Sequence, residues 1–497
     1  MFPHKVAQSL AVSLLCTASL SAQDTPLKSY ETRIGALSFE NDFENGIPTK
    51  ESSQNLFNEI DFQRACQAYI WSVPLMGFYE WMFVHDELDI ERGQLVYNES
   101  YQSKLGGLTF NTSTPYLLTY IDITKDPLLI EMPDAPVRGA THTMWQVGLA
   151  QMTKPGKYLF IGPDCDTPQG IASDIQVFKS DTNHVFFGVR LTNDTHEKRM
   201  QDMKKIKLTN FSTGKPSSTR EPFFQEKGVD LMQKRGMAFW KSLHKAINLT
   251  PVREQDRIIV DFLRPLGIEI GKEFNPSPAQ EKILEEAAFM GEAMTKNIDF
   301  NKTGRLPHAA FGPKTSTWEV ATASSPNQNR DHGVDLDGRA AWFYEAVTND
   351  IAMHGLSNHK ANPSGKNEGW GQVYLDNYRD NDHNGLNGSF HYSIEIPGDA
   401  KIADFFWTIT VYNVNNRAII DNQLQRADVG SNIPGTVKNK DGNFEFHFSP
   451  EKPDGIAKAN WVQTIPNENW FVYFRAYSPT KEFVDGKVSL PNFKRVK

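Results

Sequence analysis

Cysteine is scarce in this chain, with three residues among 497. So few thiols exclude the small secreted folds that depend on several disulfide bridges. Cys16 lies in the first segment, which leaves Cys66 and Cys165 as the pair that could join in an oxidising compartment. The alternative interpretation is that Cys66 is a small buried apolar residue and that Cys165 belongs to a turn.

The chain also lacks an excess of positive charge. Lys and Arg together number 52 against 60 Asp and Glu, which gives a formal net charge of -8. A protein that holds nucleic acid mainly through phosphate contacts needs a basic surface, so this class of partner is not expected. A content of 39% apolar and 23% charged residues is typical of a folded protein. At ~150 residues per domain, the length predicts two or three domains.

No apolar run is long enough to span a bilayer, which takes ~20 residues. The run from Val6 to Leu20 follows Lys5 and ends in small residues near Ser21 and Ala22. This arrangement is typical of a secretory signal peptide, which we assign to residues 1–22. We therefore expect an exported protein, periplasmic or extracellular, without a transmembrane anchor.

The first half of the chain begins with a polar leader, residues 23–54. Apolar residues then recur at helical spacing from Asn55 to Val73, and we expect Pro74 to end or kink this helix. Short apolar runs separated by turn residues follow: Leu117–Ile123, Leu128–Met132, Thr143–Leu149, Lys157–Ile161 and His184–Leu191. Strands at this spacing predict a β-sandwich, so residues 55–200 are assigned to a helix followed by a sandwich domain.

Helical patterning returns in residues 201–337, which we interpret as a helical insert with polar loops. One apolar stripe consists of Val229, Met232, Phe239, Trp240, Leu243 and Ile247. Ser277 and Gln280 form a capping box with Pro278 at the first helical position, which predicts a helix that continues through Met294. A further amphipathic helix is predicted from Ala340, Tyr344, Val347 and Ile351.

The last part, residues 338–497, has the clearest alternation of apolar and polar residues. The alternating runs are Phe390–Ile396, Phe405–Tyr412, Phe444–Phe448 and Trp470–Tyr477. A period of two predicts half-buried antiparallel strands, which favours a jelly-roll sandwich. The predicted fold class is therefore mainly β with a helical insert (α+β).

Several short motifs resemble a known family. They are Ala68–Trp71 with Pro74–Leu75, Phe110–Tyr116, Tyr158–Pro163, Phe406–Tyr412, Asn460–Trp461 and Phe474–Pro479. In this order they resemble the tandem family of domains of unknown function numbered 1254 (N-terminal) and 1214 (C-terminal), over most of residues 55–490. The resemblance implies an immunoglobulin-like sandwich, a helical insert and a jelly roll in an exported protein, commonly bacterial and sometimes viral. It supplies no activity and no catalytic residues, and relatives often have aspartate where this chain has Ser113, which weakens an acid or metal role there.

One loop offers oxygen ligands at metal-binding spacing. Asp380, Asp382 and Asn384 alternate and are followed by Gly385, as in the opening of a calcium-binding loop. The twelfth position is His391 instead of glutamate, which excludes an EF-hand. The sequence leaves two interpretations, an ordinary Asn/Asp/Gly turn and a calcium site, and it predicts no other cofactor.

The polar faces of two predicted C-terminal strands suggest a ligand-binding groove. The residues on these two faces are His391, Ser393 and Glu395, and Tyr473, Arg475 and Tyr477. If both faces lined one concave side, tyrosine rings and charged groups would suit a sugar or another polar polymer. The alternative is that Arg475 is a buried, paired arginine that supports the sandwich.

Two classes of function remain. The first is an exported binding or interaction protein without turnover, which takes a polar polymer or cell-surface ligand and forms a homo-oligomer; an assembly factor cannot be distinguished from it. The second is a hydrolase acting on a polar or glycan substrate, with Glu395, Asp382, His383 and His391 as acid or base groups. The nucleophile elbow, the Walker loop, the dinucleotide fingerprint and the C-x-x-C motif are all absent from the sequence, which favours the first class.

Overall fold

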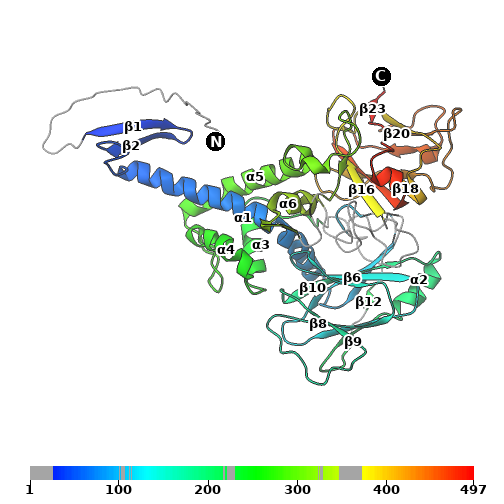
Figure 1. Cartoon of the computed structure of the whole chain (residues 1–497), viewed down its shortest axis with the longest axis horizontal. Helices are drawn as coiled ribbons and strands as arrows, with labels where there is room; N and C mark the ends of the chain where they lie inside the picture. Colours follow the sequence, from blue (N-terminus) through cyan, green and yellow to red (C-terminus); the bar gives the residue numbers. More distant parts are fainter. Residues whose placement is uncertain are drawn as a thin grey trace, which may run out of the picture.

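The computed structural model describes residues 26–99, 101, 107–110, 112, 115–216, 219–220, 230–322, 324, 328–345 and 372–496. Strand accounts for 30% and helix for 28%. The predicted α+β class, with antiparallel sheets and a central helical segment, is confirmed, but strand does not predominate as the sequence indicated. The helical content was underestimated because helices such as α1 (Lys50–Glu87) are longer than the sequence segments that show helical periodicity. Figure 1 shows a hairpin at one end, helices in the middle and two β-rich parts at the other end.

The chain begins with a hairpin and a long helix where the sequence indicated a polar leader over residues 23–54. Strands β1 (Leu27–Thr32) and β2 (Gly35–Glu40) pair antiparallel with each other. Helix α1 (Lys50–Glu87) then runs from the hairpin into the centre of the molecule. The Thr49 hydroxyl caps this helix by accepting a hydrogen bond from a first-turn amide.

Pro74 lies inside α1 and does not end the helix, although the sequence led us to expect an end or a kink there. The helix continues from Val73 through Pro74 to Glu87, and its residues from Ala65 to His85 are almost all buried. The Pro74 carbonyl accepts a hydrogen bond from the Gln146 side-chain amide at 2.7 Å. A proline inside a helix removes one backbone hydrogen bond, but burial against the other helices and a sheet overrides this local cost.

The N-terminal β-rich part contains two sheets. Its strands are β3 (Leu95–Asn98), β4 (Tyr116–Asp122), β5 (Leu128–Met132), β6 (Val137–Thr143), β7 (Gly148–Met152), β8 (Gly156–Ile161), β9 (Ile175–Lys179), β10 (His184–Leu191), β11 (Lys207–Asn210) and β12 (Thr219–Arg220). The sheet orders are β12-β3-β4-β10-β6-β7 and β11-β5-β8-β9. One face of the larger sheet packs on the smaller sheet, and Phe186 on the opposite face stacks on Phe78 of α1. Helix α2 (His196–Met203) follows β10.

The run Thr143–Leu149 was predicted as one strand, but it is mostly the turn between β6 and β7. Thr143 ends β6, and its amide donates to the Val147 carbonyl at 2.9 Å. Gln146 has a positive φ of 61°, which breaks the extended conformation. Met144 and Trp145 of this run are buried, and the Trp145 ring lies against Trp71 of α1, so burial alone does not identify a strand.

The helical middle part packs around α1. It contains α3 (Met237–Ile247), α4 (Arg257–Leu263), α5 (Pro278–Phe300), α6 (Leu336–Glu345) and the short 3-10 turns Glu254–Asp256, Arg264–Leu266, Lys302–Gly304 and Pro307–Ala309. The predicted capping box at the start of α5 is confirmed, because both Ser277 and Gln280 make its reciprocal hydrogen bonds. Val347 and Ile351 lie outside the described residues.

The C-terminal part again has two facing sheets. They are built from β13 (Glu319–Val320), β16 (Gln372–Asn377), β17 (Tyr392–Ile396), β18 (Ala403–Asn413), β19 (Asp428–Gly430), β20 (Phe444–Ser449), β21 (Trp461–Gln463), β22 (Trp470–Pro479) and β23 (Lys494–Arg495). The orders are β13-β16-β22-β18-β19 and β21-β20-β17-β23. All four predicted alternating runs form strands, and Trp407 of β18 contacts Phe444 and Phe446 of β20 between the sheets. A small ribbon, β14 (Asn329–Arg330) with β15 (Gly333–Val334), and the short helix α8 (Lys481–Val484) complete the described elements.

Among the helices of the described ranges, none combines the length and the apolar character that crossing a membrane requires.

The contact between α1 and α5 depends on a glycine, which gives a test of the fold. A Cβ atom on Gly291 would lie 2.5 Å from Cβ of Tyr69. We expect Gly291→Ala to lower the free energy of unfolding by about 1–3 kcal/mol, because the two helices must separate to admit the methyl group. Chemical denaturation measures the loss. Gly304→Ala is the matched control, since no atom lies within 4 Å of its Cβ position; equal stability of both variants would contradict close packing at Gly291.

Candidate functional site

Arg475 of β22 connects the two β-rich parts of the molecule. Its side chain is only 2% exposed. One terminal nitrogen donates to the Tyr412 hydroxyl at 2.7 Å and to the Thr410 hydroxyl at 3.2 Å. The other donates to the Thr109 carbonyl at 2.6 Å, in a segment that precedes β4 of the N-terminal part. The guanidinium therefore holds that segment against the C-terminal sheet.

The segment around Thr109 is fixed by further hydrogen bonds. The Thr109 amide donates to the Arg417 carbonyl at 2.8 Å, and the Tyr412 hydroxyl donates to the Phe110 carbonyl at 2.6 Å. Thr109 has a positive φ of 48°, a conformation that is strained for a β-branched residue. The bonds from the C-terminal part offset this strain, so the position of Phe110 depends on the other domain.

A second arginine makes the same connection from the N-terminal side. Arg190 of β10 donates to the hydroxyl of Tyr374 on β16 at 3.1 Å, and its guanidinium lies 5.5 Å from the ring centre of Tyr116. The guanidinium of Arg475 lies 4.9 Å from the ring centre of the same Tyr374. The two arginines thus both contact Tyr374, Arg190 through the hydroxyl and Arg475 through the ring, and cation–π attraction stabilises the arrangement.

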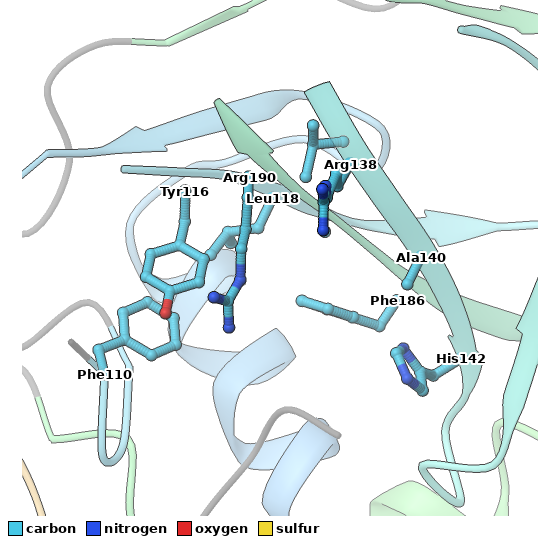
Figure 2. A pocket seen from close by; sticks show the side chains of 10 residues that line it. Phe110, Tyr116, Leu118, Arg138, Ala140, His142, Phe186 and Arg190 are labelled. Atoms are coloured by element: carbon cyan, nitrogen blue, oxygen red, sulfur yellow. The ribbon is translucent and has the colours of Figure 1, made fainter. Parts of the chain in front are cut away.

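A small cavity opens beside Arg190, with a volume of about 30 Å³. Its lining consists of Phe110, Tyr116, Leu118, Arg138, Ala140, His142, Phe186, Gly188, Val189 and Arg190. Figure 2 shows the Arg190 guanidinium beside the Tyr116 ring, with Arg138 near it and with Phe186 lying between them and His142. Apart from Phe110, which precedes β4, the lining residues come from β4, β6 and β10, where side chains two positions apart share one face of a sheet.

The cavity has a charged rim and an apolar interior. Arg138 is exposed and Arg190 is half-buried, whereas Leu118, Ala140 and Phe186 are buried. The volume is enough for one or two water molecules or for a small chemical group. Two guanidinium groups at the entrance favour a carboxylate or a similar anion, and the interior favours a short apolar tail.

A larger hollow of about 990 Å³ lies between loops of the C-terminal part and α5, but its polar groups are already engaged. The Asn413 side-chain oxygen accepts from the Asn415 amide, and that of Asn416 accepts from the Ala418 amide. The Asn469 oxygen accepts from the Asn387 side chain. These asparagines shape their own turns, so the hollow is the weaker candidate.

The six residues predicted to line one groove lie on opposite sides of the sandwich. His391, Ser393 and Glu395 alternate with buried residues that face the interior, and so do Tyr473, Arg475 and Tyr477. The first three lie along β17 and the last three on β22, in different sheets whose inner faces contact each other. Outer faces of two packed sheets point in opposite directions, so no single groove contains both sets. Only the set around Arg475 lies at the domain interface.

The acid and base groups considered for a hydrolase are not gathered into one site by the contacts of the structure. Glu395 accepts hydrogen bonds from the side-chain amides of Asn443 and Asn439 at 2.8 and 2.9 Å, which lower its pKa. Asp382 and His383 lie instead in an exposed turn whose neighbour Asn381 donates to the Phe493 carbonyl.

The predicted calcium loop uses its first carboxylate for its own turn. One oxygen of Asp380 accepts from the amides of Asp382 and Asn384 at 3.0 and 2.9 Å. Asp380 is buried, whereas Asp382 and Asn384 are exposed. In the described ranges, no three His, Cys, Asp or Glu side chains are arranged to hold a metal ion. This hydrogen-bonded turn accounts for the alternating Asp and Asn residues, and calcium binding stays a prediction.

Cys66 and Cys165 are both free thiols, so the predicted alternative of a disulfide between them is wrong. Cys66 lies in the buried part of α1, and burial raises the pKa of its thiol to about 11. A thiol with a raised pKa is almost entirely protonated at neutral pH and is a poor nucleophile. Cys66 is therefore a packing residue.

Sequence reasoning missed most of the interface site. Arg138, His142, Arg190 and Tyr374 carry no motif, and of the interface the sequence indicated only Tyr473, Arg475 and Tyr477 and the segment that ends in Tyr116. The available signal was the alternation within the predicted strands, which places a polar residue at every second position. Pairing of those strands, which the sequence does not reveal, brings the residues together.

A pair of histidines outside the cavity was also missed. His391 and His447 share a hydrogen bond of 2.9 Å between ring nitrogens, and the Glu445 carboxylate lies 3.5 Å from the second ring. Burial lowers the pKa of both imidazoles. His391 immediately precedes β17, which pairs antiparallel with β20 and its His447, so the pairing of these strands determines the contact.

Comparison with known proteins agrees with the two-part organisation. The family model for the protein of unknown function DUF1254 matches residues 94–209, and that for DUF1214 matches residues 371–481. The VPA0106 protein from Vibrio parahaemolyticus is 18% identical, with a TM-score of 0.49, and the match covers 88% of this chain and 100% of that one. A putative uncharacterized protein from Burkholderia cenocepacia is 11% identical, with a TM-score of 0.37 and coverages of 90% and 97%. No curated protein matches the chain.

Removal of the Arg475 guanidinium tests its connecting role. In Arg475→Met the Thr109 carbonyl loses its shortest hydrogen bond, so we expect a loss of about 1–3 kcal/mol in unfolding free energy. Hydrogen exchange should also accelerate at residues 107–110. Arg495→Met, which changes an exposed arginine of the same domain, is the control. Unchanged exchange at 107–110 in Arg475→Met would show that other contacts hold the segment.

The histidine pair predicts a pH dependence. Because folding lowers both imidazole pKa values, the unfolded chain binds more protons below about pH 6.5, and stability should fall as the pH decreases from there. Thermal unfolding of the native chain and of His391→Gln between neutral and mildly acidic pH measures this slope. The variant should lose less stability on acidification, whereas the exposed His383→Asn should match the native chain. Identical slopes in His391→Gln and the native chain would refute the prediction.

Proposed function

We propose that this chain, whose residues 94–209 and 371–481 match the DUF1254 and DUF1214 family models, is an exported, non-catalytic binding protein for a short-chain carboxylate. The observation that carries the proposal is the cavity with Arg138 and Arg190 at its entrance and an apolar interior.

The chemistry of the cavity specifies the ligand in two parts. Guanidinium groups bind a carboxylate through paired N–H donors, which a neutral amide cannot match. The interior beyond the rim is formed by Leu118, Ala140 and Phe186, which are buried side chains without charge. A cavity of about 30 Å³ is far smaller than the pockets of drug-sized ligands, so the tail must be short.

The position of the cavity suggests that ligand binding is coupled to the docking of the two domains. Phe110 lines the cavity, and its carbonyl is held by Tyr412 of the C-terminal part. Arg190 at the rim is bonded to Tyr374 of the same part. A bound carboxylate that contacts Arg190 therefore stabilises the docked arrangement of the two domains, as binding sites at domain interfaces commonly do.

The remaining elements of the proposal concern location and fold type. Export to the periplasm or to the outside of the cell is part of the proposal, and the signal-peptide pattern of residues 1–22 supports it. We further propose that the N-terminal pair of sheets is of the immunoglobulin-like type and the C-terminal pair of the jelly-roll type. Support comes from two facing, largely antiparallel sheets in each part.

Titration with a matched series of ligands tests the proposal. Propionate and butyrate should bind, as followed by calorimetry, whereas propionamide and butylamine should not. Arg138→Gln should raise the dissociation constant by about tenfold or more, because a hydrogen bond to a charged group is worth about 1.5–3 kcal/mol. Arg138 is exposed, so its replacement should leave the fold intact.

Arg495→Gln serves as the control for a general loss of positive charge, since Arg495 lies on β23 of the C-terminal part. It should bind butyrate as tightly as the native chain. Equal affinity for butyrate and its amide, or unchanged affinity in Arg138→Gln, would disprove carboxylate recognition at this cavity.

A further inference from the structure

The first 39 described residues form an arm that projects from the molecule. We define the arm as residues 26–64, which include β1, β2 and the first part of α1. Figure 1 shows the hairpin and this part of the helix extending away from both β-rich parts. Lys50–Arg64 is mainly exposed or half-buried, whereas the stretch that begins at Ala65 is buried.

The arm has little support from its own chain. Strands β1 and β2 form a sheet of two strands, and within the described residues only the nearby segment 47–49 adds a bridge to it, between Phe39 and Pro48. Such a small hairpin is marginally stable in water. The hairpin has a small aromatic cluster of Tyr30, Phe39 and Phe43, but Phe43 itself is 62% exposed. Exposed aromatic residues of this kind are typical of a surface that binds a partner.

The apolar surface continues from the arm onto the body. Phe57 and Ile60 are one turn apart on α1, and Arg64 on the same side lies over the ring of Phe262 in α4 at 5.4 Å. Ile258 lies one turn before Phe262 and is 72% exposed. Exposed apolar side chains therefore lie both on the arm and on α4, and the contact of Arg64 with Phe262 connects the two elements.

The size of this surface is that of a dimer interface. The exposed large apolar residues of the arm and of α4 are Leu27, Phe43, Ile47, Phe57, Ile60 and Ile258. They are 42% to 72% exposed, and together they present roughly 600 Å² at about 150–250 Å² for a large side chain. A standard interface buries about 800 Å² on each partner, so this apolar area is a large share of what a stable dimer contact needs.

We propose that the protein forms a homodimer in which the arm of each protomer packs on α4 of its partner. Each chain carries both the projecting arm and the apolar surface of α4. The arm of one copy can therefore pack on α4 of a second copy, and the reverse contact is identical. A two-fold axis then buries two identical contacts, which is the usual arrangement of soluble homodimers. In the dimer each hairpin packs against the partner, which supplies the additional contact that an isolated hairpin lacks.

Analytical ultracentrifugation of the full chain tests the proposal. The native chain should sediment as a dimer. The double variant Phe57→Glu with Ile60→Glu should raise the dimer dissociation constant by roughly a hundredfold or more, because charges would be buried at the centre of the contact. Ile258→Glu should weaken the dimer from the partner side of the same contact. Phe405→Glu is the matched control, since Phe405 is 78% exposed but lies on β18, away from the arm.

Circular dichroism should show unchanged helix content in all variants, which separates dissociation from unfolding. A monomeric native chain, or a dimer insensitive to the double variant, would overturn the proposal. An effect of the arm variant without any effect of Ile258→Glu would overturn the docking on α4. Binding of the native monomer to anionic vesicles, lost in the double variant, would show that the arm contacts a membrane surface instead.

Discussion

The hydrogen bond from Arg475 to the Thr109 carbonyl is the constraint on which the interface site depends. A backbone carbonyl that is buried at a domain boundary needs a donor, and here the donor comes from the other domain. The same tie positions Phe110, one residue further on, as a wall of the cavity. The lining residues all belong to the N-terminal part, but the wall at Phe110 depends on the docking of the C-terminal part.

Arg475 is unusual in that its charge is surrounded by aromatic rings. Tyr374, Tyr412 and Tyr473 place their ring centres 4.9, 5.7 and 5.0 Å from its guanidinium. Burial of an unpaired charge is costly, but a flat, weakly hydrated guanidinium that stacks on rings and donates three hydrogen bonds recovers much of the cost. Lysine, with a compact and strongly hydrated charge, would not fulfil this role, which explains why an arginine occupies the position.

Local patterns in the sequence predicted local structure well. The alternation in Phe444–Phe448 and the capping box at Ser277 each identified an element, because period and capping act within a few residues. The histidine pair and the interface cavity escaped prediction for the opposite reason. Residues such as His391 and His447, or Arg190 and Tyr374, meet only through strand register and domain docking, and nothing in their neighbouring sequence records those contacts.

Helix α1 shows how one element with several environments misleads sequence reasoning. Its first fifteen residues face solvent on most sides, whereas Ala65–His85 is buried almost completely by the helices and a sheet. A helix buried all around has no polar stripe, and an exposed arm with scattered apolar residues has no regular stripe either. Only the junction between them, near Phe62 and Tyr69, has the helical periodicity that the sequence displayed. At 1.5 Å per residue, the 38 residues span about 57 Å, so the arm and the interface cavity lie far apart on one rigid element. Pro74, which suggested the end of a helix, lies in the stretch where packing dominates local preference.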